Sequence, residues 1–140
     1  MTDAREVVER HVEAFNGRDA EADPWSEEAD LIAPGASMRG REEVLGFLAA
    51  FWDAFPDGRL ELSRVFAEGS VAAAEGRFIG THTGVLHTPV GDVPATSRHV
   101  EFRWMSSYDV RGDELASEHL YFDQVELLGQ LGLMPTSAAS

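Results

Sequence analysis

The sequence contains no cysteine and no lysine, and no run of apolar residues in it is long enough to cross a membrane. Without cysteine, the chain has no disulfide bonds, no thiolate chemistry and no cysteine-based zinc site. A membrane span needs about 20 consecutive apolar residues, and the start of the chain lacks the basic and apolar regions of a signal peptide. We therefore expect a soluble, cytoplasmic protein without a membrane partner.

Negative charge dominates the composition. The chain has 25 acidic residues against 11 basic residues, all of them arginine, which gives a formal net charge of −14. Such a charge repels the phosphates of nucleic acids and the surfaces of anionic membranes. We expect no nucleic-acid partner, and solubility is the simplest role for this charge.

The length of 140 residues is typical of one domain. A chain of this size buries enough surface to fold without a disulfide or a structural metal. No repeat and no linker divides the sequence. We expect a single domain over residues 1–134, followed by a flexible tail of small residues over 135–140.

The spacing of apolar residues changes along the chain. It is helical near the N-terminus and again over residues 42–54, and it becomes strand-like from residue 59 on, with glycine-containing turns. The expected strands are residues 29–33, 59–67, 71–82, 100–110 and 114–122, with a last helix at 124–131 and a short helix or turn at 18–28. This order predicts an α+β domain whose helices cover one face of a curved, mostly antiparallel sheet, with a small-molecule pocket between the layers.

A series of segments carries a family resemblance. The segments are residues 54–57, 78–84, 98–102, 111–113, 118–123 and 127–133. Together they resemble the SnoaL-like polyketide cyclase (ester cyclase) family of the NTF2-like superfamily. The resemblance implies a cone-shaped fold, often dimeric, whose cyclases close a ring by an intramolecular aldol reaction without metal or cofactor. It also implies a catalytic acid/base at Asp123, and it aligns Ser106 with a position where some members use histidine.

Alternation along the strands predicts which side chains share the pocket. If Asp123 points inward, His119 and Tyr121 point inward too, and His82 shares a face with Phe78. The other expected pocket residues are Phe102, Trp104, Ser106 and Tyr108 on one strand, with Phe15 and Trp52 from the helices.

The chemistry expected at this pocket is proton transfer. Burial in apolar surroundings raises the pKa of a carboxyl group, which makes Asp123 a candidate general base. His82, His119 or Tyr121 could donate a hydrogen bond to an oxyanion. Each candidate has a structural alternative: Asp123 could cap the last helix, and His82 could be a hydrogen-bonded core residue. The histidines form no spaced metal motif, so we expect no metal and no cofactor.

The combined prediction is a cofactor-independent enzyme that acts on a small apolar ketone or polyketide-like substrate by acid/base catalysis. We expect a homodimer formed through the exposed face of the sheet. Two alternatives stay open: a binding protein that uses the same cavity without turnover, and a domain that only dimerises. An epoxide hydrolase with an Asp-Arg-Asp cluster is disfavoured, because Arg103 does not share the face of Trp104.

Overall fold

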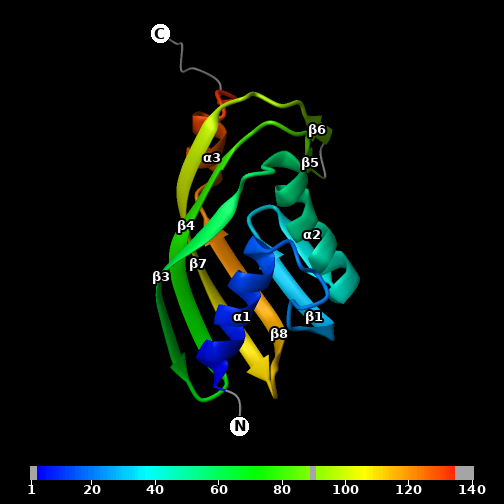
Figure 1. The fold of residues 1–140 in the computed structure, drawn as a ribbon, viewed down its shortest axis with the longest axis vertical. Helices are drawn as coiled ribbons and strands as arrows, with labels where there is room; N and C mark the ends of the chain where they lie inside the picture. Colours follow the sequence, from blue (N-terminus) through cyan, green and yellow to red (C-terminus); the bar gives the residue numbers. More distant parts are fainter. Residues whose placement is uncertain (1–2, 89–90, 135–140) are drawn as a thin grey trace.

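The computed structural model describes residues 3–88 and 91–134 (Figure 1). Its elements are α1 (Ala4–Asn16), β1 (Trp25–Ala33), β2 (Ala36–Arg39), α2 (Arg41–Ala54), β3 (Arg59–Glu68), β4 (Val71–Thr81), β5 (Leu86–Thr88), β6 (Gly91–Val93), β7 (His99–Arg111), β8 (Glu114–Phe122) and α3 (Gln124–Gln130). None of the described helices is long and apolar enough to cross a membrane. The tail expected at 135–140 lies outside the described residues.

Six strands form one sheet in the order β2-β1-β8-β7-β4-β3. All neighbouring pairs are antiparallel except β1 and β8, which run parallel. The strands β5 and β6 form a separate hairpin. Helices α1 and α2 cover one face of the curved sheet (Figure 1). The predicted α+β arrangement, with helices covering one face of a curved, mostly antiparallel sheet, is therefore confirmed.

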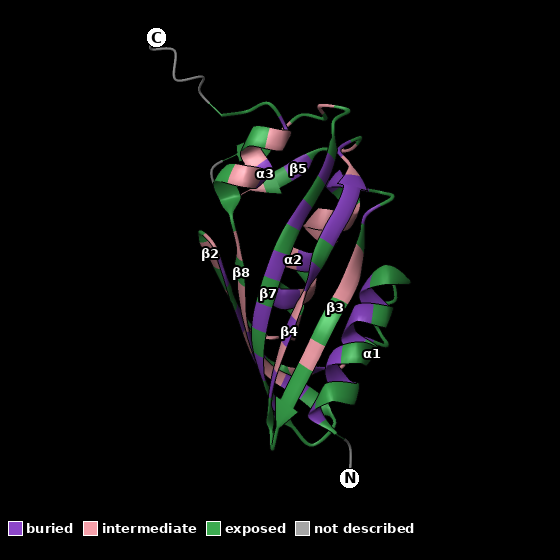
Figure 2. Cartoon of the chain, turned by 90° about the vertical axis from the view of Figure 1, so that its left-hand side faces the viewer, coloured by how far each residue is buried: buried purple, intermediate pink, exposed green. Residues whose placement is uncertain are grey.

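The core lies between these two helices and the sheet. On β7 every second residue from Val100 to Val110 is buried, and the residues between them are exposed. Figure 2 shows this alternation as bands along β7. The opposing layer includes the buried face of α1, with Val7, Val8 and Phe15 at helical spacing. The apolar face of the sheet is thus the inner face, and the strand alternation tells which side chains can reach a pocket there.

Some elements differ from the prediction. Of the helix or turn expected at 18–28, the first residues form a turn, as one alternative had it; no helix forms, and β1 begins already at Trp25, whose buried indole belongs to the core. The strands β2, β5 and β6 are not anticipated. They span only three or four residues each, and such short segments carry too few alternating positions to be recognised from the sequence.

Candidate active site

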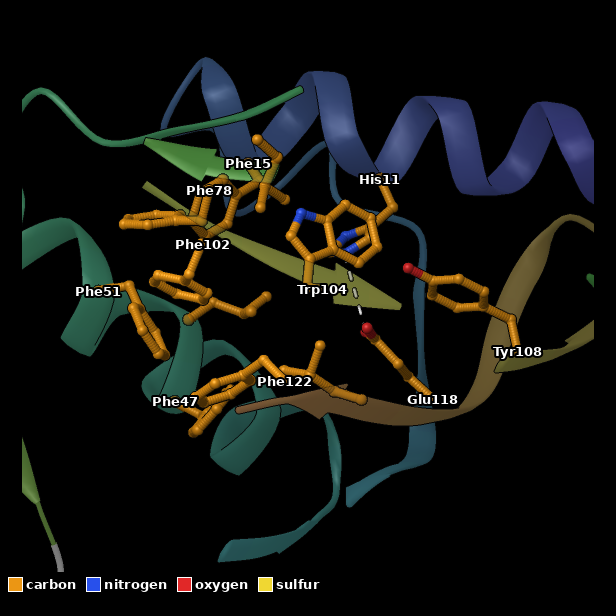
Figure 3. A pocket seen from close by; sticks show the side chains of 13 residues that line it. His11, Phe15, Phe47, Phe51, Phe78, Phe102, Trp104, Tyr108, Glu118 and Phe122 are labelled. Atoms are coloured by element: carbon orange, nitrogen blue, oxygen red, sulfur yellow. Dashed lines mark ion pairs between the residues drawn. The ribbon is translucent and has the colours of Figure 1, made fainter. Parts of the chain in front are cut away.

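An apolar pocket lies between the inner face of the sheet and helices α1 and α2 (Figure 3), and the space in it, together with the solvent at its open mouth, amounts to about 480 Å³. Its apolar lining comes from both layers and is largely aromatic. These residues are Phe15, Phe47, Leu48, Phe51, Leu60, Phe78, Phe102, Trp104, Leu120 and Phe122. Among the described lining residues, three carry ionisable groups, and Figure 3 shows His11, Tyr108 and Glu118 gathered at one end.

A buried relay of three side chains occupies that end. His11 comes from α1, Asp23 from the loop before β1, and Glu118 from β8. His11 Nδ1 lies 2.8 Å from Asp23 Oδ1, and His11 Nε2 lies 3.8 Å from Glu118 Oε1. Their side chains are only 3%, 0% and 5% exposed. We call this set the Asp23–His11–Glu118 relay; it couples a histidine to two carboxyl groups away from water.

Glu118 lines the pocket, and only one of its two carboxyl oxygens is hydrogen-bonded within the described residues. Its Oε2 accepts a hydrogen bond of 2.7 Å from the Ser106 hydroxyl. Its Oε1 is buried and has no hydrogen-bond partner within the described part of the chain. Burial raises the pKa of Glu118, although the nearby His11 and the hydroxyls of Ser106 and Tyr108 act to lower it. A carboxyl group in this position can hold a proton at higher pH than a solvated glutamate can.

Opposing effects act on the pKa of the His11 imidazole. Burial by itself lowers its pKa, but the charge of Asp23, the hydrogen bond to Asp23 and the charge of Glu118 together raise it. Burial and the charge of Glu118 hold the pKa of Tyr108 well above its usual value, so its hydroxyl, which points toward Glu118 (Figure 3), keeps its proton. His11 and Glu118 thus both have raised pKa values, and their facing atoms Nε2 and Oε1 lie 3.8 Å apart.

The structure does not bring Asp123, His119, Tyr121 and His82 together. Asp123 is exposed, and its Oδ1 accepts hydrogen bonds from the backbone N–H groups of Val125 and Glu126 at the start of α3. Tyr121 is 61% exposed and lies with Asp123 beside a hollow on the outer face of the sheet. The expected convergence of these residues on the pocket is wrong.

The error comes from the alternation on β8. Its pocket-facing residues are Glu118, Leu120 and Phe122, which is the opposite set from the one containing Asp123. His119 and Tyr121 alternate with them and therefore belong to the outer face. Asp123 follows the last residue of the strand and acts as an N-cap.

His82 is a core residue. Its ring is fully buried, lies 5.3 Å from that of Phe55, and does not line the pocket. Its Nδ1 is 3.0 Å from the Thr96 hydroxyl and accepts the Thr96 N–H at 3.2 Å. Burial lowers the pKa of His82, so the imidazole is held neutral, as this acceptor role requires.

The remaining predicted pocket residues divide into two groups. Those in the pocket wall are Phe15, Phe78, Phe102, Trp104 and Tyr108. Trp52 is not in the wall; it packs against Phe15 with 5.6 Å between ring centres. Ser106 is also outside the wall, and it acts on the site through its hydrogen bond to Glu118.

Sequence reasoning missed all three members of the relay. His11 could have been found as the polar residue in the apolar stripe of α1, between Val8 and Val12. Glu118 could have been found as a carboxylate in phase with Leu120 and Phe122 on β8. Asp23 gives no such signal, because its loop has no periodic pattern.

The lining offers little to a metal or a charged cofactor. Within residues 3–88 and 91–134, no three His, Asp or Glu side chains are grouped as a metal site. No arginine is found in the described pocket lining to pair with a phosphate. The arrangement is suited to moving protons at the polar end of an uncharged ligand.

Comparison with solved structures finds several similar folds. A candidate SnoaL-like polyketide cyclase from Jannaschia sp. CCS1 is 16% identical with a TM-score of 0.81, over 94% of this chain and 93% of that one. IdmH, a candidate polyketide cyclase from Streptomyces antibioticus, is 24% identical with a TM-score of 0.78, over 94% and 99%. A Catenulispora acidiphila protein with a ketosteroid isomerase-like fold, solved with trimethylamine, is 20% identical with a TM-score of 0.76, over 92% and 94%.

A search of curated proteins finds no match to the sequence. The sequence pattern of the SnoaL-like domain matches residues 8–119, which is most of the chain. The matched segment contains His11, Asp23 and Glu118. On the strength of this match, the chain belongs to the SnoaL-like family.

Proposed function

We propose that this protein is a cofactor-independent acid/base enzyme that acts on a small apolar ketone of the polyketide type, by aldol ring closure. One observation carries the proposal: the unpartnered Oε1 of Glu118 and the Nε2 of His11 lie side by side at the end of an aromatic pocket. Membership of the SnoaL-like family and the neighbours described as candidate polyketide cyclases support this substrate class.

The relay is suited to exchanging one proton with a ligand. Asp23 accepts the Nδ1–H of His11 and so leaves Nε2 facing the pocket. A single proton can then reside either on His11 Nε2 or on Glu118 Oε1. The 3.8 Å between these atoms is too long for a direct hydrogen bond. A ligand oxygen or an acidic carbon can reach both atoms, so the ligand completes the path for the proton.

In the first step, the ketone binds with its carbonyl at the polar end of the pocket. Neutral His11 takes a proton from the carbon next to the carbonyl, and protonated Glu118 gives its proton to the carbonyl oxygen. The product is an enol, with His11 as imidazolium and Glu118 as carboxylate. A raised pKa makes His11 a stronger base, and it lets Glu118 hold the proton that it donates at a higher pH than a solvated glutamate can.

In the second step, the enol carbon attacks another carbonyl of the same molecule and forms the new C–C bond. The enol hydroxyl returns its proton to Glu118 as its C=O bond is restored. The new alkoxide takes the proton held by His11. Both residues end in their starting states, and no electron acceptor or added reactant is consumed. The Tyr108 hydroxyl can donate a hydrogen bond to an oxygen that becomes negative during these transfers.

Exchange of α-protons provides the test, because it isolates the first step. The protein is incubated with 2-tetralone, a small apolar ketone, in D₂O, and loss of the α-proton signal is followed by ¹H NMR. Wild type is compared with Glu118→Gln, and with Glu114→Gln as a matched control that is exposed on the same strand. Ligand affinity is measured in parallel by quenching of tryptophan fluorescence, since Trp104 lines the pocket.

We expect Glu118→Gln to bind 2-tetralone but to lose on the order of 10² to 10⁴-fold in catalysed exchange. Glu114→Gln should exchange at the wild-type rate. Equal exchange by Glu118→Gln and wild type would contradict the role of Glu118. Tight binding by wild type without exchange above that of the buffer would favour the alternative, a non-catalytic binding protein.

A further inference from the structure

The loop that carries Asp23 is held by one arginine from another element. Arg41 is the first residue of α2. Its Nη2 donates to the backbone carbonyl of Ala20 at 3.0 Å and to that of Asp23 at 3.2 Å. Its Nε donates to the carbonyl of Trp25 at 3.2 Å. One half-buried guanidinium group therefore fixes the backbone before, at and after Asp23.

The position of this arginine is not explained by the helix that contains it. A positive charge in the first turn of a helix opposes the helix dipole, which favours acidic residues there. Glu42 and Glu43 follow that rule, and Arg41 does not. No ion pair of Arg41 is found among the described residues. Instead, the planar guanidinium group of Arg41 donates hydrogen bonds to three backbone carbonyls. The ammonium group of a lysine cannot donate in this geometry.

The Asp23 carboxylate depends on its backbone for its position. Its Oδ1 contacts His11, and its Oδ2 is buried without a hydrogen-bond partner in the described part of the chain. On the other side of the loop, the Pro24 carbonyl accepts the Leu115 N–H at 2.6 Å. Among the described residues, no other side chain hydrogen-bonds the carboxylate, so its position follows from the contacts that hold its loop, which include those of Arg41 and Leu115.

We propose that Arg41 is a positioning residue, which holds Asp23 against His11 by clamping the backbone of the loop between α1 and β1. Through Asp23 it fixes the tautomer of His11 that leaves Nε2 free to face Glu118 and the pocket. The catalytic consequence of this role rests on the proposed function. The effect of Arg41 on the pKa of His11 does not rest on the proposed function, and it can be measured without a substrate.

The test follows the His11 ring by ¹H–¹⁵N NMR across a pH titration. Arg41→Gln removes the guanidinium group, and Arg41→Lys keeps its positive charge. The control is Arg39→Gln, which removes a positive charge from an exposed residue two positions earlier in the chain. The direction in which the pKa of His11 changes distinguishes a loss of charge from a displacement of Asp23. Removing a nearby positive charge can only raise the pKa of His11. Releasing Asp23 from its place lowers this pKa, because the main source of its elevation is lost.

We expect the pKa of His11 to fall in both Arg41→Gln and Arg41→Lys and to stay unchanged in Arg39→Gln. α-Proton exchange of 2-tetralone should fall roughly 10- to 100-fold in both Arg41 variants, with its affinity unchanged, because Arg41 does not line the pocket. A His11 pKa that stays constant or rises in a folded Arg41→Lys protein would overturn the proposal. If wild type shows no exchange, the proposed function fails, and the titration still decides the role of Arg41.

Discussion

Replacing Asp23 by asparagine removes the charge behind His11 while keeping the size of the side chain. The wild-type contact is a buried 2.8 Å hydrogen bond between a carboxylate and an imidazole that this carboxylate helps to protonate. Hydrogen bonds to charged groups contribute about 1.5–3 kcal/mol, against about 0.5–1.5 kcal/mol for neutral ones. The substitution should therefore lower the free energy of unfolding by about 1–2 kcal/mol. For a domain of this size, that corresponds to a loss of roughly 2–8 °C in Tm.

The loss should depend on pH in a defined direction. The pKa of His11 is raised in the folded state, so its stabilising effect is complete below the ordinary value of 6.5 and is lost as pH rises through the folded value. The difference in Tm between wild type and Asp23→Asn should accordingly be larger at about pH 6 than at about pH 9. Differential scanning calorimetry at both values measures this difference.

Asp19→Asn is the matched control for this experiment. Asp19 is an exposed carboxylate on the same loop, where its Oδ1 accepts the Ala22 N–H, and asparagine can keep that bond. We expect its Tm to lie within about 1–2 °C of wild type, as for most surface changes. An Asp23→Asn protein as stable as wild type at both pH values would refute the coupling of Asp23 to His11.

Three further expectations concern other parts of the molecule. Gly84→Ala should lower the free energy of unfolding by about 1–3 kcal/mol or more, because the new Cβ would lie 1.8 Å from the backbone oxygen of Asp53. The control Gly46→Ala, whose new Cβ meets no atom within 4 Å, should raise the free energy of unfolding by about 0.5–1 kcal/mol. Urea denaturation measures both changes. Asp123→Ala should lose about 0.5–2 kcal/mol through the missing helix cap, whereas Asp123→Asn should be nearly silent in stability and in α-proton exchange. Light scattering at tens of micromolar should give the mass of a homodimer. Met105 lies on the outer face of the sheet and is 44% exposed, so Met105→Glu should give a monomer. A monomer mass for wild type would contradict the expected dimer.

Local patterns were sufficient to predict the fold but not the parity of β8. On β7 the alternation is unambiguous, because every inward residue from Val100 to Val110 is apolar or packed in the core. On β8, apolar residues occur at both parities, with Leu120, Tyr121 and Phe122 in succession. The register between β7 and β8 also shifts near Asp109 and Val110. The sequence of β8 therefore did not decide which residues face the pocket.

The relay itself depends on contacts between distant segments. His11 lies on α1 and Glu118 on β8, far apart in the sequence, and their side chains face each other across the end of the pocket (Figure 3). The loop that brings Asp23 to His11 is hydrogen-bonded by Arg41, which comes from α2. Such contacts leave no periodic signal in one sequence. A polar residue within an apolar pattern is the one indication of such a site that a single sequence offers, and His11 on α1 is an example.

A crystal structure of the protein soaked with 2-tetralone would show directly whether Glu118 and His11 act on a bound ketone. We expect the ketone in the aromatic pocket, with its oxygen within hydrogen-bond distance of Glu118 Oε1, its acidic α-carbon toward His11 Nε2, and its rings among the side chains of Phe78, Phe102 and Phe122. A ketone bound in the outer hollow beside Tyr121 and Asp123, or one bound in the pocket with its oxygen away from Glu118, would contradict this expectation.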